Sequence, residues 1–193
     1  MLKKYLIGYN VVLFLAWSLF FAWQITHGFV IDKISITILN IAQVAALLEI
    51  LHSKLGWVKS PVFTTALQIS SRVFVLFWLN VIPYEHQILL FGISGITIVS
   101  IAWSITEMVR YSYYTFSLLN KEIKFLTFLR YTLFIVLYPL GITGEGMIMA
   151  SVLKWNNYDF SLINIIIFIV ILSYLPFFPK LYGYMWQQRK KKF

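Results

Sequence analysis

Long apolar runs, each long enough to cross a bilayer, constrain this chain more than any other feature. A membrane-spanning helix needs about 20 mostly apolar residues, and six segments of the 193-residue sequence meet this requirement. They cover residues 7–25, 38–55, 62–82, 88–111, 125–153 and 162–186. The runs are continuous rather than alternating, which is typical of helices and not of a membrane barrel. The sequence therefore predicts an all-α polytopic membrane protein, a single domain of six transmembrane helices in one bundle.

The composition argues against a water-soluble fold. Hydrophobic residues make up 60% of the chain, charged residues make up 12%, and the mean hydropathy is +0.80. A soluble domain carries about 25% charged residues. The chain contains no Cys, which excludes a disulfide framework, a thiolate metal site and a cysteine nucleophile. The few charged residues are therefore the informative ones.

Basic residues alternate between the segments that join the apolar runs. They gather before the first run, after the second, after the fourth and after the sixth. These residues are Lys3 and Lys4, Lys54 and Lys59, Lys121 and Lys124, and Arg189, Lys190, Lys191 and Lys192. The remaining loops are poor in basic residues, and the third contains Glu85. Because cytoplasmic loops are enriched in Lys and Arg, the pattern predicts both termini in the cytoplasm. The net charge of +9 then belongs mostly to one membrane face, which argues against nucleic acid as a partner.

Several ionisable side chains lie inside the predicted spans. Insertion of Arg, Lys or Asp at the middle of a span costs about 2.5–3.5 kcal/mol, so such residues are usually paired or functional. They are Glu49 and His52, Arg72 with the amide of Gln68 one turn before it, Glu107 and Arg110, and Arg130 and Glu145. With the predicted orientation, most of them lie in the cytoplasmic half of the membrane. We expect a polar cavity that opens to the cytoplasm; ion pairs that only hold the bundle together are the alternative.

The fifth run contains helix-disturbing residues between two candidate catalytic groups. Tyr138 and Glu145 are seven residues apart, so in a continuous helix they share a face about 10.5 Å apart at Cα. Pro139 and Gly141 predict a kink or break between them. A buried hydroxyl and a buried carboxyl can form an acid–base pair, although an aromatic-core Tyr and an interfacial Glu would have the same spacing. Counted from Lys124, Glu145 would lie about 31 Å along a straight helix, so the helix either starts later or is broken at Pro139.

Five separated segments together resemble a known family. They are residues 48–52 (LEILH), 60–72 (SPVFTTALQISSR), 103–114 (WSITEMVRYSYY), 130–134 (RYTLF) and 137–145 (LYPLGITGE). Their sequence, order and spacing resemble those of the 3-hydroxyacyl-CoA dehydratases, the family once called protein tyrosine phosphatase-like A. The resemblance covers nearly the whole chain. Because a tyrosine phosphatase needs a cysteine thiolate, the absence of Cys excludes the chemistry of the older name.

The resemblance implies an enzyme of very-long-chain fatty acid elongation in the endoplasmic reticulum membrane. It would catalyse the third step of the cycle, the dehydration of a (3R)-3-hydroxyacyl-CoA to the trans-2-enoyl-CoA. The catalytic pair would be Tyr138 and Glu145. Supporting or substrate-binding positions would be Glu49, Gln68, Arg72, Glu107, Arg110, Arg130 and Gly141. The expected partners are the acyl-CoA substrate, the lipid bilayer and other elongase components, without a metal or other cofactor.

The chemistry of dehydration suggests roles for these residues. A base must take the C2 proton and a donor must protonate the leaving C3 hydroxyl, for which Glu145 and Tyr138 are the candidates. The reverse assignment, with Tyr138 activated by an Arg, stays open. We expect backbone amides near Pro139 and Gly141 to bind the thioester oxygen. The phosphates of coenzyme A would be held by basic residues at the cytoplasmic side. Those candidates are Arg72, Arg110, Arg130, Lys121 and Lys124.

Two alternative functions fit the same composition. A proton-coupled transporter would use Glu49, His52 and Glu145 as a proton path, and a non-catalytic scaffold would bind elongase partners. A further signal lies at the C-terminus, where Lys190 and Lys191 occupy the fourth and third positions from the end. This pattern resembles the di-lysine signal that returns membrane proteins to the endoplasmic reticulum, and ordinary positive charge on the cytoplasmic side is the alternative.

Overall fold

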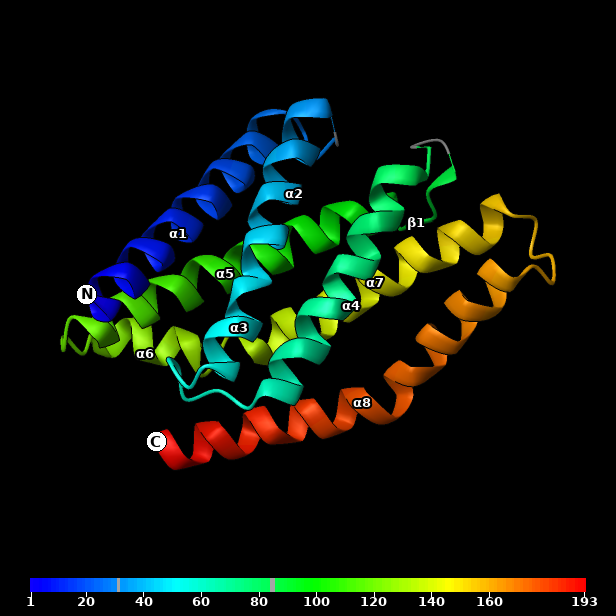
Figure 1. The fold of residues 1–193 in the computed structure, drawn as a ribbon. Coiled ribbons are helices and arrows are strands. Elements are labelled where there is room, and N and C mark those ends of the chain that lie inside the picture. The colour runs from blue at the N-terminus through cyan, green and yellow to red at the C-terminus, as the bar shows by residue number, and fades with distance from the viewer. Residues whose placement is uncertain (31, 84–85) are drawn as a thin grey trace.

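The computed structural model describes residues 1–30, 32–83 and 86–193 (Figure 1). Glu85, used above to characterise the third loop, lies outside the described residues. The elements are α1 (Leu2–Thr26), α2 (Lys33–Ala46), α3 (Leu48–Lys54), α4 (Val62–Val81), β1 (Leu89–Leu90), β2 (Ile93–Ser94), α5 (Gly95–Leu118), α6 (Lys124–Arg130), α7 (Phe134–Trp155) and α8 (Leu162–Lys192). The long helices form one bundle with both termini toward the same end.

Among the described residues, five segments are long and apolar enough to cross a membrane. They are α1, the combined segment α2–α3 (Lys33–Lys54), α4, α7 and α8. The chain is therefore a mostly helical, multi-pass membrane protein. The helix α5 does not meet the same hydropathy criterion and carries Glu107 and Arg110 in its sequence. It packs against both α1 and α7, so a helix outside the five candidate spans lies inside the bundle.

The buried core lies where α1, α2, α4, α5 and α7 meet. Large apolar side chains from all five helices interlock there and are almost fully buried. They include Leu13, Trp17, Phe20, Leu39, Val75, Val99, Trp103, Tyr111 and Met149. By contrast, α8 contributes only Ile167 to this core, and its packing contacts are mainly with α7. This peripheral helix matters for the site described below.

Side chains cap the starts of α2 and α5. Asp32 accepts a hydrogen bond from the Ser35 backbone N–H at 2.7 Å, and the Ser35 hydroxyl accepts one from the Asp32 N–H at 2.9 Å. This reciprocal pair starts α2, and the Ser35 N–H holds the pKa of the Asp32 carboxyl below its usual range. At the start of α5, the Ser94 hydroxyl accepts from the Thr97 N–H at 3.2 Å. Both caps satisfy amide groups that a helix N-terminus leaves without partners.

The predicted span at residues 88–111 was placed too early. Its first part forms the antiparallel hairpin β1–β2, in which Phe91 and Gly92 have φ values of 52° and 79°. Positive φ at both central residues is the geometry of a tight two-residue hairpin. The prediction failed because apolar content alone does not separate short strands from helix. Since α5 runs from Gly95 to Leu118, Glu107 and Arg110 lie inside this helix instead of closing it.

The predicted span at residues 125–153 is interrupted near its start. The helical run breaks between α6 and α7, and α7 then continues without a break through Pro139. Of the two alternatives stated above, the later start of the helix is therefore correct. Glu145 lies eleven residues into α7, or about 17 Å along its axis, which is near mid-span. The other four predicted spans match α1, α2–α3, α4 and α8, with ends that differ by a few residues.

The proline in α7 is accommodated by a contact from α8. Pro139 has no N–H, so the carbonyl of Ile135, four residues earlier, has no helical donor. The Tyr182 hydroxyl of α8 donates to this carbonyl oxygen at 3.2 Å. Because α7 is continuous, the expectation that backbone amides near Pro139 and Gly141 become free to bind the thioester oxygen is wrong. The group released by the proline is a carbonyl, and it links α7 to α8.

Two glycines set the separation of α5 and α7. A Cβ atom on Gly144 would lie 2.8 Å from Val99 Cγ2 and 2.9 Å from the Gly95 carbonyl oxygen. A Cβ on Gly95 would lie 2.8 Å from the Gly144 carbonyl oxygen. Contacts this short do not occur for real Cβ atoms, so only glycine allows the two backbones to approach this closely. The close approach brings Glu145, the next residue along α7, against α5.

This packing predicts different effects for two neighbouring glycines of α7. Gly144→Ala should destabilise the protein by about 1–3 kcal/mol, because the added methyl group overpacks the contact with α5. Gly146→Ala is the matched control, since its added Cβ would meet nothing within 4 Å and Ala is the better helix former. Thermal unfolding of the purified variants in detergent measures both effects. Equal midpoints for the two variants would contradict the close helix approach.

Candidate active site

A buried ion-pair network joins α3, α4 and α5. Arg110 donates to Glu107 Oε2 from Nε at 2.8 Å and from Nη2 at 2.5 Å. Its guanidinium also binds both oxygens of Glu49, with Nη2 2.7 Å from Oε1. Arg72 donates from Nη1 to the remaining oxygen of Glu107. Two carboxylates and two guanidinium groups are thus paired, and the charges balance.

The network is shielded from the surroundings by the helices and by aromatic rings. The Glu107 side chain is only 2% exposed. The Tyr111 hydroxyl donates to Glu49 Oε1 at 2.5 Å, and the Arg110 guanidinium lies 4.4 Å from the centre of the Tyr111 ring. Removing one partner from a buried ion pair leaves an uncompensated charge, which is strongly destabilising. The four charged residues therefore act as a unit.

Trp103 connects this network to Glu145. The Arg72 guanidinium lies 5.3 Å from the centre of the Trp103 indole, within the range of a cation–π interaction. The other side of the connection is a hydrogen bond, since Trp103 Nε1 donates to Glu145 Oε1 at 3.0 Å. An unbroken series of contacts therefore runs from the ion pairs of α3, α4 and α5 to the carboxylate on α7.

The Glu145 carboxylate is buried and has a donor on each oxygen. Only 8% of the residue is exposed. In addition to the Trp103 contact from α5, the Tyr174 hydroxyl of α8 donates to Oε2 at 2.7 Å. An indole N–H can only donate, so at least one oxygen of Glu145 must accept. Both oxygens therefore have a hydrogen-bond donor, which fixes the orientation of the carboxylate.

Tyr138 is held by stacking, and its hydroxyl has no hydrogen-bond partner among the described residues. Its ring is nearly parallel to those of Phe178 and Tyr182, with centroids 5.5 Å and 6.2 Å away. The Arg72 guanidinium lies over the Trp103 ring, whose N–H is bonded to Glu145. A phenol, a carboxylate and a nearby guanidinium therefore share one region, and such groups can take and give protons.

The surface of α7 between Tyr138 and Glu145 is bare at Gly141. This residue shares their helix face, because it is three residues after the Tyr and four before the Glu. A Cβ on Gly141 would lie 3.9 Å from Ala102 Cβ and 4.0 Å from Trp103 Nε1. Glycine is therefore not required by packing here. Gly141 is itself buried, so its missing side chain leaves only a small gap beside the indole N–H, between the two candidate catalytic groups.

Three polar residues expected in the same zone lie outside the network. Gln68 is exposed, and only its backbone carbonyl accepts a hydrogen bond, from the Ser71 hydroxyl. Arg130 makes no ion pair with a described residue, and its guanidinium lies 6.0 Å from the centre of the Tyr114 ring. The His52 ring is buried and contacts the Tyr5 hydroxyl at 3.0 Å. The hydrogen bonds of Glu49, His52 and Glu145 with the described residues therefore do not form the continuous proton path considered above.

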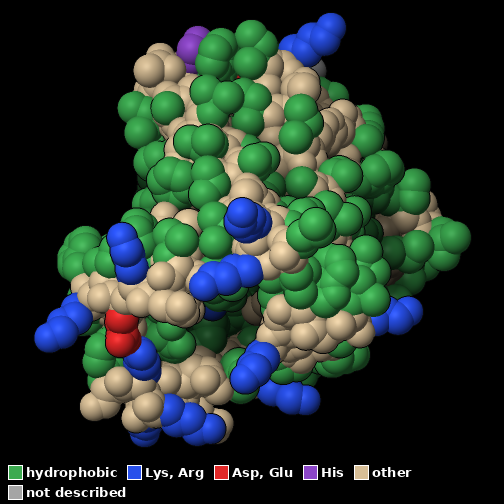
Figure 2. All heavy atoms as spheres, turned by 60° about the vertical axis from the view of Figure 1, so that its left-hand side comes forward, with side chains coloured by type: hydrophobic (Ala, Val, Ile, Leu, Met, Phe, Trp, Pro, Cys, Tyr) green, Lys and Arg blue, Asp and Glu red, His purple; other side chains and the backbone are tan. Residues whose placement is uncertain are grey.

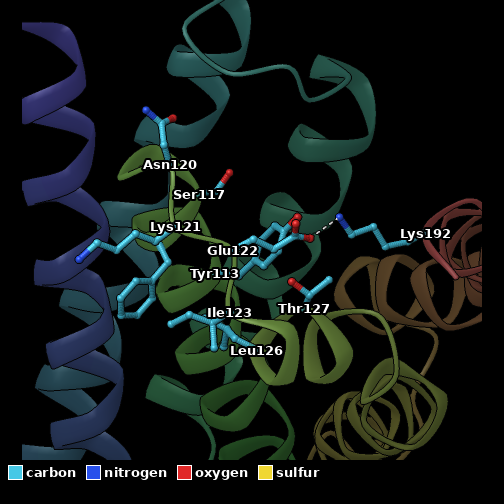
Figure 3. A pocket seen from close by; sticks show the side chains of 10 residues that line it. Tyr113, Ser117, Asn120, Lys121, Glu122, Ile123, Leu126, Thr127 and Lys192 are labelled. Atoms are coloured by element: carbon cyan, nitrogen blue, oxygen red, sulfur yellow. Dashed lines mark hydrogen bonds and ion pairs between the residues drawn. The ribbon is translucent and has the colours of Figure 1, made fainter.

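Two cavities lie away from the buried ion-pair network of α3, α4 and α5. One, of about 260 Å³, is at the turn between α5 and α6 and is bounded by the Glu122–Lys192 ion pair (Figure 3). The other, of about 520 Å³, is lined by Tyr5, His52 and Trp57 among others. Neither is lined by the charged residues of the network. The polar groups expected to line a cavity pair with one another instead.

Two site residues, Trp103 and Tyr174, were not selected from the sequence. Trp103 opens one of the five family-like segments, so a signal was present. Tyr174 follows Ser173 in an otherwise apolar run, and only the packing of α8 on α7 reveals its contact. No group of three or more His, Asp or Glu residues that could hold a metal ion occurs in the part of the chain that the structure describes.

Comparison with known proteins gives consistent matches. The family model described as protein tyrosine phosphatase-like protein, PTPLA, matches residues 43–193. The chain is 39% identical to the very-long-chain (3R)-3-hydroxyacyl-CoA dehydratase hpo-8 of Caenorhabditis elegans, over 98% of this chain and 94% of that protein. It is 37% identical to the dehydratase PASTICCINO 2B of rice, over 98% of this chain and 92% of that protein.

The match to mammalian relatives is equally strong but covers less of them. The chain is 41% identical to very-long-chain (3R)-3-hydroxyacyl-CoA dehydratase 2 of the mouse, over 79% of this chain and 64% of the mouse protein. No solved structure matches the chain.

The ion-pair network predicts that Glu107 contributes strongly to stability. Glu107→Gln leaves Arg72 and Arg110 with an excess positive charge in the bundle, and we expect a loss of about 3–5 kcal/mol. Glu122→Gln is the control, because it breaks the exposed pair with Lys192 and exposed pairs contribute little. Thermal midpoints in detergent compare the two variants. An unchanged midpoint for Glu107→Gln would show that the network does not hold the helices together.

Proposed function

The chain belongs to the protein tyrosine phosphatase-like (PTPLA) family, and we propose that it dehydrates (3R)-3-hydroxyacyl-CoA to trans-2-enoyl-CoA in very-long-chain fatty acid elongation. Relatives that match most of the chain carry the dehydratase name. The structural observation that carries the proposal is the face of α7, where the Tyr138 phenol and the Glu145 carboxylate flank the bare surface at Gly141. This surface is where the C2–C3 unit of the acyl chain would lie.

Glu145 is the base and Tyr138 the acid in this proposal. Glu145 accepts hydrogen bonds on both oxygens, which favours its ionised form, whereas the Tyr138 hydroxyl is not engaged by a described residue. Glu145 takes the C2 proton, the C3–O bond breaks, and Tyr138 gives its proton to the departing hydroxyl, so that water leaves. The proton on Glu145 then returns to the Tyr138 oxygen, which restores both groups. The Arg72 guanidinium stabilises the negative charge that moves between them.

The basic end of the bundle suits the phosphates of coenzyme A. Lys and Arg side chains dominate the charged groups on the face drawn in Figure 2. The exposed lysines at this end include Lys121 after α5, Lys124 at the start of α6, and Lys190 and Lys191 at the end of α8. With the phosphate groups bound here, the extended arm of coenzyme A would reach inward along α7 toward Tyr138. Apolar helices on either side would accept the acyl chain.

We further propose a single domain with six spans and with both termini in the cytoplasm. The six are the five candidate spans described above and, in addition, α5. Support comes from the common location of the termini, from the basic residues near them and from the interior position of α5. The endoplasmic reticulum membrane is the proposed location, consistent with the lysines at positions 190 and 191. Other elongation enzymes are the proposed partners, because one of them makes the hydroxyacyl substrate and another consumes the enoyl product.

The catalytic assignment predicts near-complete loss of turnover in two conservative variants. Tyr138→Phe and Glu145→Gln should each lower kcat by about 10²–10⁴-fold, because each removes one proton-transfer group. Tyr158→Phe is the control, since Tyr158 is 65% exposed and lies in the loop after α7. The assay gives the purified protein 3-hydroxypalmitoyl-CoA and measures the enoyl thioester by mass spectrometry. Full activity in both variants would refute the site, and an inactive wild type would favour a scaffold or transporter.

The topology predicts opposite labelling of two introduced cysteines. Because the natural chain has no Cys, single-cysteine variants give labelling without background. In sealed microsomes, a membrane-impermeant maleimide should label Lys59→Cys, between α3 and α4. It should label Phe160→Cys, between α7 and α8, only after the membrane is permeabilised. Labelling of both positions from the same side would contradict the six-span arrangement.

A further inference from the structure

We propose that Tyr174 of α8 is a positioning residue that holds the Glu145 carboxylate for proton abstraction. This inference rests on the proposed dehydratase function and adds to it a residue outside the α7 segment that resembles the family signature. Tyr174 acts through Glu145, not by contact with the substrate. The consequence is that α8, the long helix with the least share in the core, completes the active site.

The first argument is the way the carboxylate is held. A glutamate side chain rotates about three bonds, so a single contact does not fix the orientation of its oxygens. Here Trp103 Nε1 binds Oε1 from α5 at 3.0 Å, and the Tyr174 hydroxyl binds Oε2 from α8 at 2.7 Å. Two donors on two different helices, on opposite oxygens, define the plane of the carboxylate. Catalytic groups need this kind of fixed geometry to approach the reacting carbon productively.

The second argument is that the same face of α8 also holds the other member of the pair. Tyr174, Phe178 and Tyr182 are spaced four residues apart and therefore follow one face of the helix; we call them the aromatic ladder. Phe178 and Tyr182 stack on the Tyr138 ring. The Tyr182 hydroxyl binds the carbonyl of Ile135 that Pro139 leaves without a helical donor. One ladder thus contacts Tyr138 at one end and Glu145 at the other.

The third argument separates this role from simple packing. A tyrosine that only fills space needs its ring and gains nothing from placing its hydroxyl on a buried carboxylate. Without that hydroxyl, Oε2 would lose its donor in an apolar surrounding, where an unpartnered polar oxygen is unfavourable. The carboxylate would then reorient to find another partner. The expected defect is therefore in turnover and not in the binding of the coenzyme A portion, which Tyr174 does not contact in this proposal.

The test compares two Tyr→Phe changes on the same helix. Tyr174→Phe keeps the ring and removes the hydroxyl; Tyr184→Phe is the matched control, because Tyr184 is 45% exposed and lies outside the ladder. We expect kcat for 3-hydroxypalmitoyl-CoA to fall about tenfold to a hundredfold in Tyr174→Phe, the effect of losing one hydrogen bond to a charged group. KM should stay unchanged, and Tyr184→Phe should match the wild type in both constants.

A second measurement needs no turnover and applies if Tyr174→Phe is less stable. Thermal midpoints are measured for Tyr174→Phe alone, for Glu145→Ala alone and for the double variant. If the hydroxyl acts through Glu145, its removal should lower the midpoint in the wild-type background but have little effect once the carboxylate is gone. Equal losses in both backgrounds would mean that Tyr174 only packs, and would overturn the proposal.

The outcomes separate this inference from the proposed function. An active wild type with an unchanged kcat in Tyr174→Phe would overturn the positioning role and leave the dehydratase assignment intact. A wild type that does not dehydrate the substrate would overturn the proposed function and this inference with it. A reduced kcat at constant KM, together with non-additive midpoints, supports both.

Discussion

The Arg72 guanidinium, paired with Glu107 and lying over Trp103, is the interaction on which the rest of this structure depends. It belongs to a charge-balanced group with Glu49 and Arg110, which allows four ionised side chains to exist inside an apolar bundle. Through Trp103 it reaches Glu145, the carboxylate proposed to act as the base. The same contacts explain why α5, which carries Glu107 and Arg110, lies between α1 and α7: its polar residues need partners from several helices at once.

Backbone features bring the catalytic face of α7 to this centre. Gly95 and Gly144 let α5 and α7 approach closely, so that Glu145 meets Trp103. Pro139 does not break α7; it releases a carbonyl that α8 binds through Tyr182. Gly144 and Pro139 of the family-like segment at 137–145 therefore serve helix packing on two sides. One side is the rigid core, and the other is the peripheral helix α8, whose aromatic ladder we propose as the outer wall of the site.

Hydropathy and charge in the sequence predicted the apolar segments and all four charged members of the ion-pair network. They left open whether the fifth helix starts later or is broken at Pro139, because residues 131–133 contain neither proline nor glycine that would mark the break before Phe134. They also did not predict that Gln68 would be exposed, since spacing along α4 does not reveal which neighbour that face meets. The Tyr174 contact joins residues 29 positions apart in the chain, so it depends on how α8 packs. Local patterns thus indicate which residues matter, and tertiary packing decides which of them meet.

The central claim is that the reacting carbons of the substrate lie on α7 between Tyr138 and Glu145. The most direct test is an experimental structure of the Glu145→Gln variant, which should bind without turnover, in complex with a (3R)-3-hydroxyacyl-CoA. We predict that C2 and C3 lie over Gly141, with the 3-hydroxyl within hydrogen-bond distance of the Tyr138 hydroxyl and the phosphates at the basic end of the bundle. A hydroxyacyl group bound in either of the two cavities away from α7, with Tyr138 unoccupied, would contradict the account.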